Sequence, residues 1–377
     1  MPIKDKVVTW YIQNIILPHR EILDKPGFVV TTFTEDKYVT YLREFFLPER
    51  LIEIIEKKIV EQYGETGKQV LYSSGKKFGY LYCSMSNFPS VKDAAEKELS
   101  QFAYLFVRYC EGVFASQADH NLNLEKREFE IFFKDYIICR HNGLGQIMTE
   151  GGSAGIWSYI MQDKTIEAIQ TECQGRGDNR CAVLCAPRER IEKITNNFFI
   201  ETDLLDQTFD TTYKSLNEIR ETTFAQNSLQ HLINLGFFDF RHGILSYKNI
   251  RFFPAESHLL YIIENEIMKL EGGEQCLFDA CYEFGKKLQQ IYGESDYQKF
   301  ILDFFPSLGF GEIRELNQEK FLIAAIYYPW TLFSNTSKYI ILRDMLSGFI
   351  SGALNKKIEL KKYDIDIKSY LTLTLSP

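Results

Sequence analysis

Residues 170–181 read Gln-Thr-Glu-Cys-Gln-Gly-Arg-Gly-Asp-Asn-Arg-Cys, so that Cys173 and Cys181 enclose a Gly-Asp pair. Glycine tolerates the backbone conformation of a tight turn and aspartate bonds to nearby backbone amides, so this pair predicts a turn. Alternating residues from Ile166 precede it, and a second apolar run, CAVLC, follows it. The pattern predicts a β-hairpin whose base brings two thiols together, either as a metal clip or as packed thiols.

A helix with a face of small residues is expected immediately before this hairpin. It contains Gly151-x-x-x-Gly155, followed by Ile-Trp-Ser-Tyr-Ile-Met. Residues four positions apart lie on the same face of a helix, so another element can approach the two glycines closely. Two interpretations stay open: this face packs on a sheet, or it forms the wall of an apolar pocket lined by Trp157, Tyr159 and Phe132.

This order of elements resembles the 4-vinyl-reductase domain family. The C-terminal signature of that family is a Gly-x-x-x-Gly helix, a Gly-Lys turn, an alternating strand and then Glu-x-x-Cys-x-x-x-Gly-Asp-x-x-Cys. In this chain, Gln170 stands at the position of the signature's Glu. The resemblance implies helices packed against a small antiparallel sheet, the fold of nitric-oxide-signalling ligand domains and Golgi-transport tethering subunits, and a role in handling a ligand. The residues that match the signature are Gly151, Gly155, Lys164, Cys173, Gly177, Asp178 and Cys181.

The resemblance also implies a zinc site. In sensors of aromatic compounds that resemble this family, an upstream Cys, the motif Glu and the two motif Cys hold zinc, which takes about four N, S or O ligands. Cys173 and Cys181 carry over to that set, and Cys139 is the candidate upstream ligand, with His141 as its alternative. The Glu position holds a glutamine, a poor zinc ligand, and Glu172 is a displaced candidate for it. Packing of the thiols as small apolar side chains is the alternative.

The chain also contains two similar halves. Residues 33–46 and 240–253 align without a gap, and an amphipathic helix ended by glycine follows each of them. Gly348-x-x-x-Gly352 repeats the glycine helix of residues 151–155 further along. Self-similarity over so long a distance indicates a duplicated domain rather than a solenoid. The predicted fold class is α+β, with two tandem repeats of helices packed on a small antiparallel sheet, which form an intrachain pseudo-dimer.

The expected domain boundaries follow this repeat. Residues 1–27 are expected to be an N-terminal helical extension, and residues 28–187 the first 4-vinyl-reductase-like domain with the Cys motif. Residues 188–235 are charged and lack the Pro, Gly and Ser of a flexible linker, so they predict a helical connector, with helical spacing from Tyr213 onward. Residues 236–377 form the second copy, whose Cys motif is lost and whose end reads as one alternating strand.

Composition and charge exclude several classes of protein. The 377 residues are 15% aromatic, which is enough to line large apolar cores and pockets. The net charge of -8, without a basic run, argues against nucleic-acid binding. No apolar run approaches the ~20 residues that cross a bilayer, and a signal-peptide pattern is missing. Eight cysteines in so long a chain fit a reducing compartment, so we expect a cytoplasmic protein.

Sequence motifs of catalysis are missing. The six histidines lack metalloprotease spacing, and no serine-nucleophile, P-loop or dinucleotide-binding motif is found. The sequence therefore favours a non-catalytic binding or sensory protein for a small hydrophobic molecule, which signals through a partner protein or a homodimer. One alternative is a protein-interaction scaffold resembling the tethering subunits, which an exposed apolar patch would favour. The other is an accessory factor in tetrapyrrole metabolism, which colour in the purified protein would favour.

Overall fold

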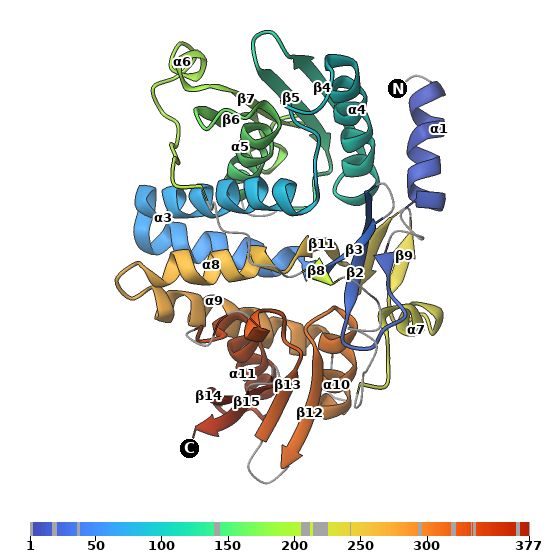
Figure 1. Cartoon of the computed structure of the whole chain (residues 1–377). Coiled ribbons are helices and arrows are strands. Elements are labelled where there is room, and N and C mark those ends of the chain that lie inside the picture. Colours follow the sequence, from blue (N-terminus) through green and yellow to red (C-terminus); the bar gives the residue numbers. More distant parts are fainter. Residues whose placement is uncertain are drawn as a thin grey trace. The chain divides into compact units, whose positions relative to one another are not determined.

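The computed structural model is a mixed α+β structure in which antiparallel sheets pack against helices (Figure 1). Contacts divide the chain into two compact units: unit 1 comprises 1–19, 59–210 and 242–244, and unit 2 comprises 20–58, 211–241 and 245–377. The structure describes residues 3–16, 21–35, 38–138, 144–204, 212–213, 225–241, 243–292, 296–317, 322–332, 334, 337–366 and 370–376.

These units differ from the predicted domains at residues 20–58, which belong to unit 2. The predicted boundaries follow an internal sequence repeat, whereas the units follow contacts, so the four predicted domains remain a prediction. In the described part of the chain, no helix is both long enough and apolar enough to cross a bilayer.

Unit 1 contains one four-stranded antiparallel sheet with the strand order β4-β5-β7-β6. The predicted hairpin around the Gly-Asp pair is confirmed as β6 and β7, and Gly177 adopts the left-handed conformation at its turn (φ +101°). The elements of unit 1 are α1 (Ile3–Tyr11), the π-helical turn η1 (Ile12–Ile16), the second part of α3 (Glu49–Met85), α4 (Glu96–Val113), β4 (Gln117–Asn123), β5 (Glu128–Lys134), α5 (Ile147–Met161), β6 (Ile166–Glu172), the 3₁₀ turn η2 (Gln174–Arg176), β7 (Cys181–Pro187) and α6 (Arg188–Ile191).

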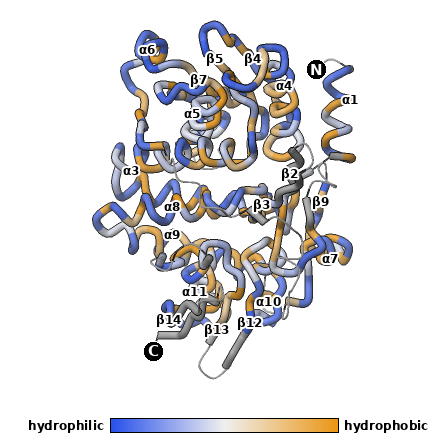
Figure 2. Tube along the Cα trace, in the orientation of Figure 1, coloured by the Kyte–Doolittle hydropathy of each residue, from blue (hydrophilic) through white to orange (hydrophobic). Residues whose placement is uncertain are grey.

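The predicted N-terminal extension contains helix α1, and its residues 21–22 form strand β1. Figure 2 shows hydrophilic and hydrophobic residues mixed along α1. Its inner face packs on α4, where Ile12 contacts Val113 and the Thr9 hydroxyl donates to Glu111 (3.3 Å). Its outer face leaves apolar side chains in solvent, including Val7 at 60% and Trp10 at 58% exposure.

The glycine helix α5 crosses α3 backbone to backbone. A Cβ on Gly151 would lie 2.0 Å from the Tyr72 carbonyl oxygen, and one on Gly155 would lie 2.1 Å from the Lys76 carbonyl oxygen. Heavy atoms cannot approach so closely, so glycine is required at both positions. The glycines therefore face a helix, and the expectation that they face a sheet or line a pocket is wrong.

Helix α3 itself is bent where its sequence predicts an end. Gly64 has non-helical dihedral angles (φ 55°, ψ −127°) and separates two helical parts. Glycine adopts positive φ without the steric penalty of a side chain, which explains the interruption at this residue. The part after Gly64 supplies the surface on which α5 lies.

Unit 2 contains a seven-stranded sheet and a four-stranded sheet. Its elements are β1 (Glu21–Ile22), β2 (Val29–Glu35), β3 (Tyr38–Pro48), the start of α3, β8 (Thr212–Tyr213), α7 (Leu229–Asn234), β9 (Asp239–Arg241), β10 (Ile244–Tyr247), β11 (Ile250–Glu256), α8 (His258–Met268), α9 (Gly273–Tyr292), α10 (Tyr297–Ser307), β12 (Glu312–Asn317), β13 (Leu322–Ile326), the 3₁₀ turn η4 (Pro329–Leu332), α11 (Ile340–Leu354), β14 (Glu359–Asp366) and β15 (Tyr370–Ser376).

The seven-stranded sheet joins two hairpins, which contain the aligned stretches 33–46 and 240–253. Strands β2 and β3 form the first, and β10 and β11 form the second, with a turn at Lys248 (φ 43°) and Asn249 (φ 69°). Two consecutive residues with positive φ give the twist that a two-residue hairpin turn requires. Strand β3 then pairs with β11, which places Phe46 opposite Pro254.

The four-stranded sheet of unit 2 has the order β12-β13-β15-β14, the same chain order of strands as the sheet of unit 1. A glycine helix again precedes the third strand: α11 crosses α9, and a Cβ on Gly348 would lie 2.1 Å from the Tyr282 carbonyl oxygen. The end of the chain forms two strands, β14 and β15, rather than the single alternating strand expected, because one alternating pattern continues through both strands of a hairpin.

The predicted helical connector is not helical in most of its described part. After α6 the chain has no helix in residues 195–204, and Tyr213 lies in strand β8. Residues 214–224, where most of the expected helix falls, lie outside the described residues. Phe198, Phe199 and Leu204 of this part make their apolar contacts without a helix, and such packing, more than local propensity, decides whether a helix forms.

Candidate functional site

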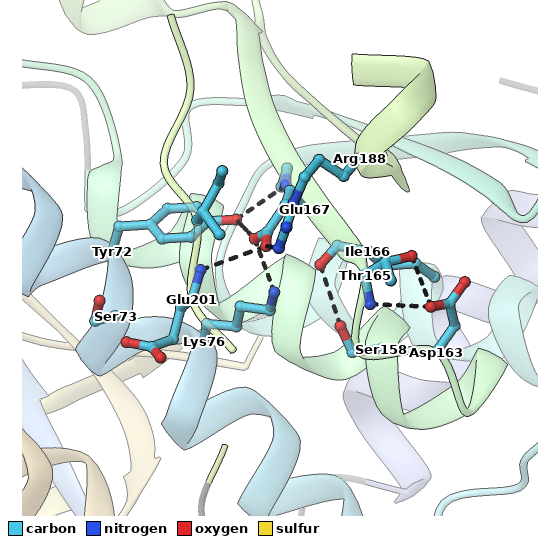
Figure 3. A network of polar contacts seen from close by, with 12 residues as sticks. Tyr72, Ser73, Lys76, Ser158, Asp163, Thr165, Ile166, Glu167, Arg188 and Glu201 are labelled. Atoms are coloured by element: carbon cyan, nitrogen blue, oxygen red, sulfur yellow. Dashed lines mark hydrogen bonds and ion pairs between the residues drawn. The ribbon is translucent and has the colours of Figure 1, made fainter. Parts of the chain in front are cut away.

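A buried carboxylate, Glu167 on β6, is the centre of a polar network in unit 1 (Figure 3). Its side chain is 0% exposed and forms an ion pair of 2.7 Å with the Lys76 ammonium group, which is also 0% exposed. The Tyr72 hydroxyl donates to the same carboxylate oxygen (2.7 Å) and accepts from the Ala168 amide (3.0 Å). Arg188 on α6 donates to the other oxygen (3.3 Å).

Burial opposes the charges of this network. It raises the pKa of Glu167 and lowers the pKa of Lys76, while the opposite charge of each partner acts against this shift. Burial and the Glu167 charge both raise the pKa of Tyr72, so its hydroxyl stays protonated and donates. The contacts of this network join α3, β6 and α6. Because Lys76 and Glu167 are closed to solvent, they are not accessible to a substrate in this conformation.

A second buried carboxylate, Glu150, lies one turn into α5. Its carboxylate accepts from the backbone amide of Gln170 (2.9 Å), and burial raises the pKa of Glu150 to about 7. The Gln170 side chain turns to the start of α5, where its oxygen accepts from the Gln146 amide (3.2 Å). The residue at the signature's Glu position therefore fixes the beginning of α5.

Cys173 and Cys181 both lie fully buried at the base of the predicted hairpin. The Gln174 amide donates to the Cys181 sulfur (3.4 Å), a contact that stabilises a sulfur carrying negative charge. The Asp178 carboxylate accepts from the Cys173 amide (2.7 Å) and so closes the turn between them.

The other predicted zinc ligands are not assembled around these sulfurs in the described residues. Glu172 forms a surface ion pair with Arg180 (2.8 Å), next to a register shift in the pairing of β6 with β7 between Gln170 and Glu172. Cys139, the predicted upstream ligand, and its alternative His141 lie outside the described residues. Within the part of the chain that is described, no group of three potential ligands occurs. Cys173 and Cys181 thus fit two of the roughly four positions of a zinc site.

The three predicted pocket residues lie in different surroundings. Trp157 is buried, stacks on Phe129 (4.9 Å between ring centroids) and donates to the Arg127 carbonyl (3.0 Å). Tyr159 contacts Tyr80 edge to face (5.6 Å). Phe132 lies under the Arg180 guanidinium (4.1 Å) on the opposite face of β5 from Phe129. The structure does not bring these three together.

An aromatic cluster at α3 and α4 is a feature that the sequence analysis missed. Phe88, in the connection between the two helices, contacts Tyr82 (5.6 Å), Phe102 (4.8 Å) and Phe106 (6.1 Å), and Tyr82 contacts Phe78 (5.9 Å). All five rings are partly buried and partly exposed. The signal in the sequence was the spacing of four residues within each aromatic pair, which places both rings on one helix face.

A small apolar cavity of about 20 Å³ lies in unit 2. A cavity of roughly 150 Å³ is needed to hold benzene, so this one does not hold an aromatic ring. Its lining residues come from α10, β12, β13 and α11 and are Tyr297, Gln298, Ile301, Leu302, Ile313, Ile323 and Ile350.

Comparison with known proteins gives little further information. No family model and no curated protein matches the chain. Among solved structures, one that matches is the phenol-responsive sensory domain of the transcription activator PoxR with phenol. It is 17% identical, has a TM-score of 0.32, and the match covers 50% of this chain and 93% of that one. A likeness this distant carries no argument about function here.

Proposed function

We propose that this chain is a non-catalytic binding protein for a small hydrophobic molecule, and that the molecule binds at the aromatic cluster of α3 and α4. The supporting observation is that five aromatic rings, each in contact with at least one other ring of the cluster, stay partly exposed. Folding alone favours burial of such rings, so their exposure favours a binding role. The 4-vinyl-reductase resemblance agrees with this role.

The chemistry of the cluster favours a flat apolar ligand. Phe102 and Phe106 stack nearly parallel (16°), whereas Phe88 meets both edge to face (68° and 73°). Such an arrangement offers both ring faces and ring edges, which are the two surfaces that an aromatic guest contacts favourably. A tetrapyrrole is one flat guest, so visible absorption of the purified protein tests that alternative directly.

Replacing Phe88 by Ala should weaken binding of indole, a small planar probe, by about five-fold, since one lost aromatic contact is worth roughly 1 kcal/mol. The measurement is isothermal titration with indole, after native mass spectrometry has shown any molecule that co-purifies. Phe278→Ala is the matched control, because Phe278 is also partly buried and stacks on Tyr282 (5.4 Å) in unit 2. Equal affinities of wild type and both variants would refute the site.

We also propose that Cys173 and Cys181, together with Cys139, hold a structural zinc ion. The supporting observations are the burial of Cys173 and Cys181 and the amide that donates to Cys181. Cys181→Ser should then abolish zinc in metal analysis and lower the melting temperature by at least 5 °C more than Cys276→Ser, whose thiol is buried in α9. Equal melting temperatures and a metal-free wild type would favour packed thiols.

Two matching arrangements support the proposal that the chain is a tandem duplication forming an intrachain pseudo-dimer. The two four-stranded sheets share one strand order, and in each a helix whose glycine meets another helix backbone precedes the third strand. We propose 4-vinyl-reductase-like domains at 28–187 and 236–377 on this basis.

A protein-interaction scaffold is the second candidate function. The observation that favours it is the outer face of α1, where Val7, Trp10 and Tyr11 are 60%, 58% and 49% exposed. Apolar side chains in such a row are typical of a surface that another protein covers. Trp10→Ser should leave indole binding unchanged, and a partner or homodimer lost with this variant would support the scaffold.

A further inference from the structure

Residues 197–204 cross α3 without forming a helix or a strand, and we call this segment the strap. Side chains hold it at several points. The Gln69 amide donates to the Ile200 carbonyl (3.0 Å), and the Tyr72 ring contacts Phe199 (5.5 Å). Lys77 lies 3.8 Å from both Glu201 and Asp203.

The buried carboxylate of Glu167 completes the attachment. The Glu201 amide donates to the same Glu167 oxygen that Arg188 contacts, at 3.3 Å (Figure 3). One side chain thus bonds to α3, α6 and the strap together. Replacement of Glu167 therefore removes or weakens a direct hydrogen bond of the strap.

The remaining contacts of the strap are uneven. Phe198 packs on the apolar cluster of Ile169, Ala186 and Ile191, and Leu204 is 4% exposed. Ile200 is 42% exposed, and the Asp203 side chain is 88% exposed. An ion pair with one partner in solvent contributes little to stability. The strap lies outside any helix or strand and is held by side chains, and segments attached in this way open at lower free energy than the packed core around them.

The strap lies in the chain between α6 and β8. It follows α6 of unit 1, and residues 212–213 downstream form β8, which pairs with β3 in unit 2. The strap therefore lies on the connection that leads from one unit to the other.

We propose that residues 197–204 are a detachable strap, latched on α3 by the Glu167 carboxylate, which opens while unit 1 stays folded. Opening frees the connection to β8 and uncovers Tyr72, Lys76 and Lys77. This device does not rest on the binding proposal, because it operates in the chain without ligand.

Hydrogen exchange of the full chain, followed by mass spectrometry, tests the strap. In Glu167→Gln, which also leaves the Lys76 ammonium group without its partner, exchange of strap amides should accelerate about ten-fold more than exchange of α5 amides. Lys77→Ala removes both ion pairs with the strap and should give about three-fold faster exchange there. Arg190→Ala is the control, because it removes an exposed ion pair of α6 with Glu128 (2.7 Å) and should change nothing in the strap.

Two outcomes would overturn the proposal. In one, both variants leave the strap rates unchanged. In the other, strap and α5 amides of the wild type exchange at one common rate, which means that the strap opens only when unit 1 unfolds. If Glu167→Gln does not fold, Lys77→Ala decides alone, since it keeps the buried ion pair of Lys76 with Glu167.

Discussion

Gly151→Ala should lower the free energy of unfolding of unit 1 by about 3 kcal/mol, the upper part of the range for overpacking a core. The new methyl group would lie 2.0 Å from the Tyr72 carbonyl oxygen and 3.0 Å from the Lys76 amide nitrogen. Both are backbone atoms, so the helices must separate, because no side chain can rotate away. Urea denaturation followed by circular dichroism measures the change.

The neighbouring glycine is the control for this prediction. A Cβ on Gly152 would meet its nearest atom, the Gly75 carbonyl oxygen, at 3.8 Å, which is ordinary contact. Gly152→Ala should therefore leave stability unchanged or raise it by up to about 1 kcal/mol, since alanine favours a helix more than glycine does. Equal destabilisation by Gly151→Ala and Gly152→Ala would show that helix α5 does not contact α3 through one face.

Lys76→Met should destabilise unit 1 by about 3–5 kcal/mol, the range for removal of one partner from a buried ion pair. The variant leaves the Glu167 carboxylate closed to solvent, with Tyr72, Arg188 and the Glu201 amide as its remaining partners. Adding Glu167→Gln to Lys76→Met should recover part of this loss, because the second change removes the buried charge. Urea denaturation of the single and double variants measures the coupling.

An exposed ion pair in the same unit gives the comparison. Arg190 is 48% exposed on its side chain and contacts Glu128 at 2.7 Å. Arg190→Ala should cost less than about 1 kcal/mol, because solvent already screens this pair. A loss for Lys76→Met no larger than that for Arg190→Ala would contradict the burial of the network.

Hairpins and the glycine helix were predictable because their signals are local. The turn at Gly177 depends on a single residue that tolerates positive φ, and the Phe33–Phe46 pattern alternates within one hairpin. Which glycine of one glycine helix matches which glycine of the other was harder to predict. By contact, Gly348 matches Gly155 rather than Gly151. Gly155 meets the residue three positions before Gly79 on α3, and Gly348 meets the residue three positions before Gly285 on α9; Gly79 and Gly285 in turn each meet the carbonyl three residues before that glycine.

The serines that follow support the same alignment. Ser158 donates to the Ile166 carbonyl (3.3 Å), and Ser351 donates to the Ile358 carbonyl (3.1 Å), each three residues after its glycine. A Gly-x-x-x-Gly pattern repeats every helical turn, so sequence alone cannot distinguish a match from one shifted by a turn.

The candidate site depended on contacts that no local pattern contains. Tyr72 and Glu167 are 95 residues apart in the chain, and Lys76 reads in the sequence as an ordinary polar residue of a helix. The sequence by itself determined the hairpins, the bend at Gly64 and the need for small residues in α5. Only the tertiary structure decided which backbone those glycines meet and which charges become buried, because burial is set by the elements that pack together and not by the residues beside them in the chain.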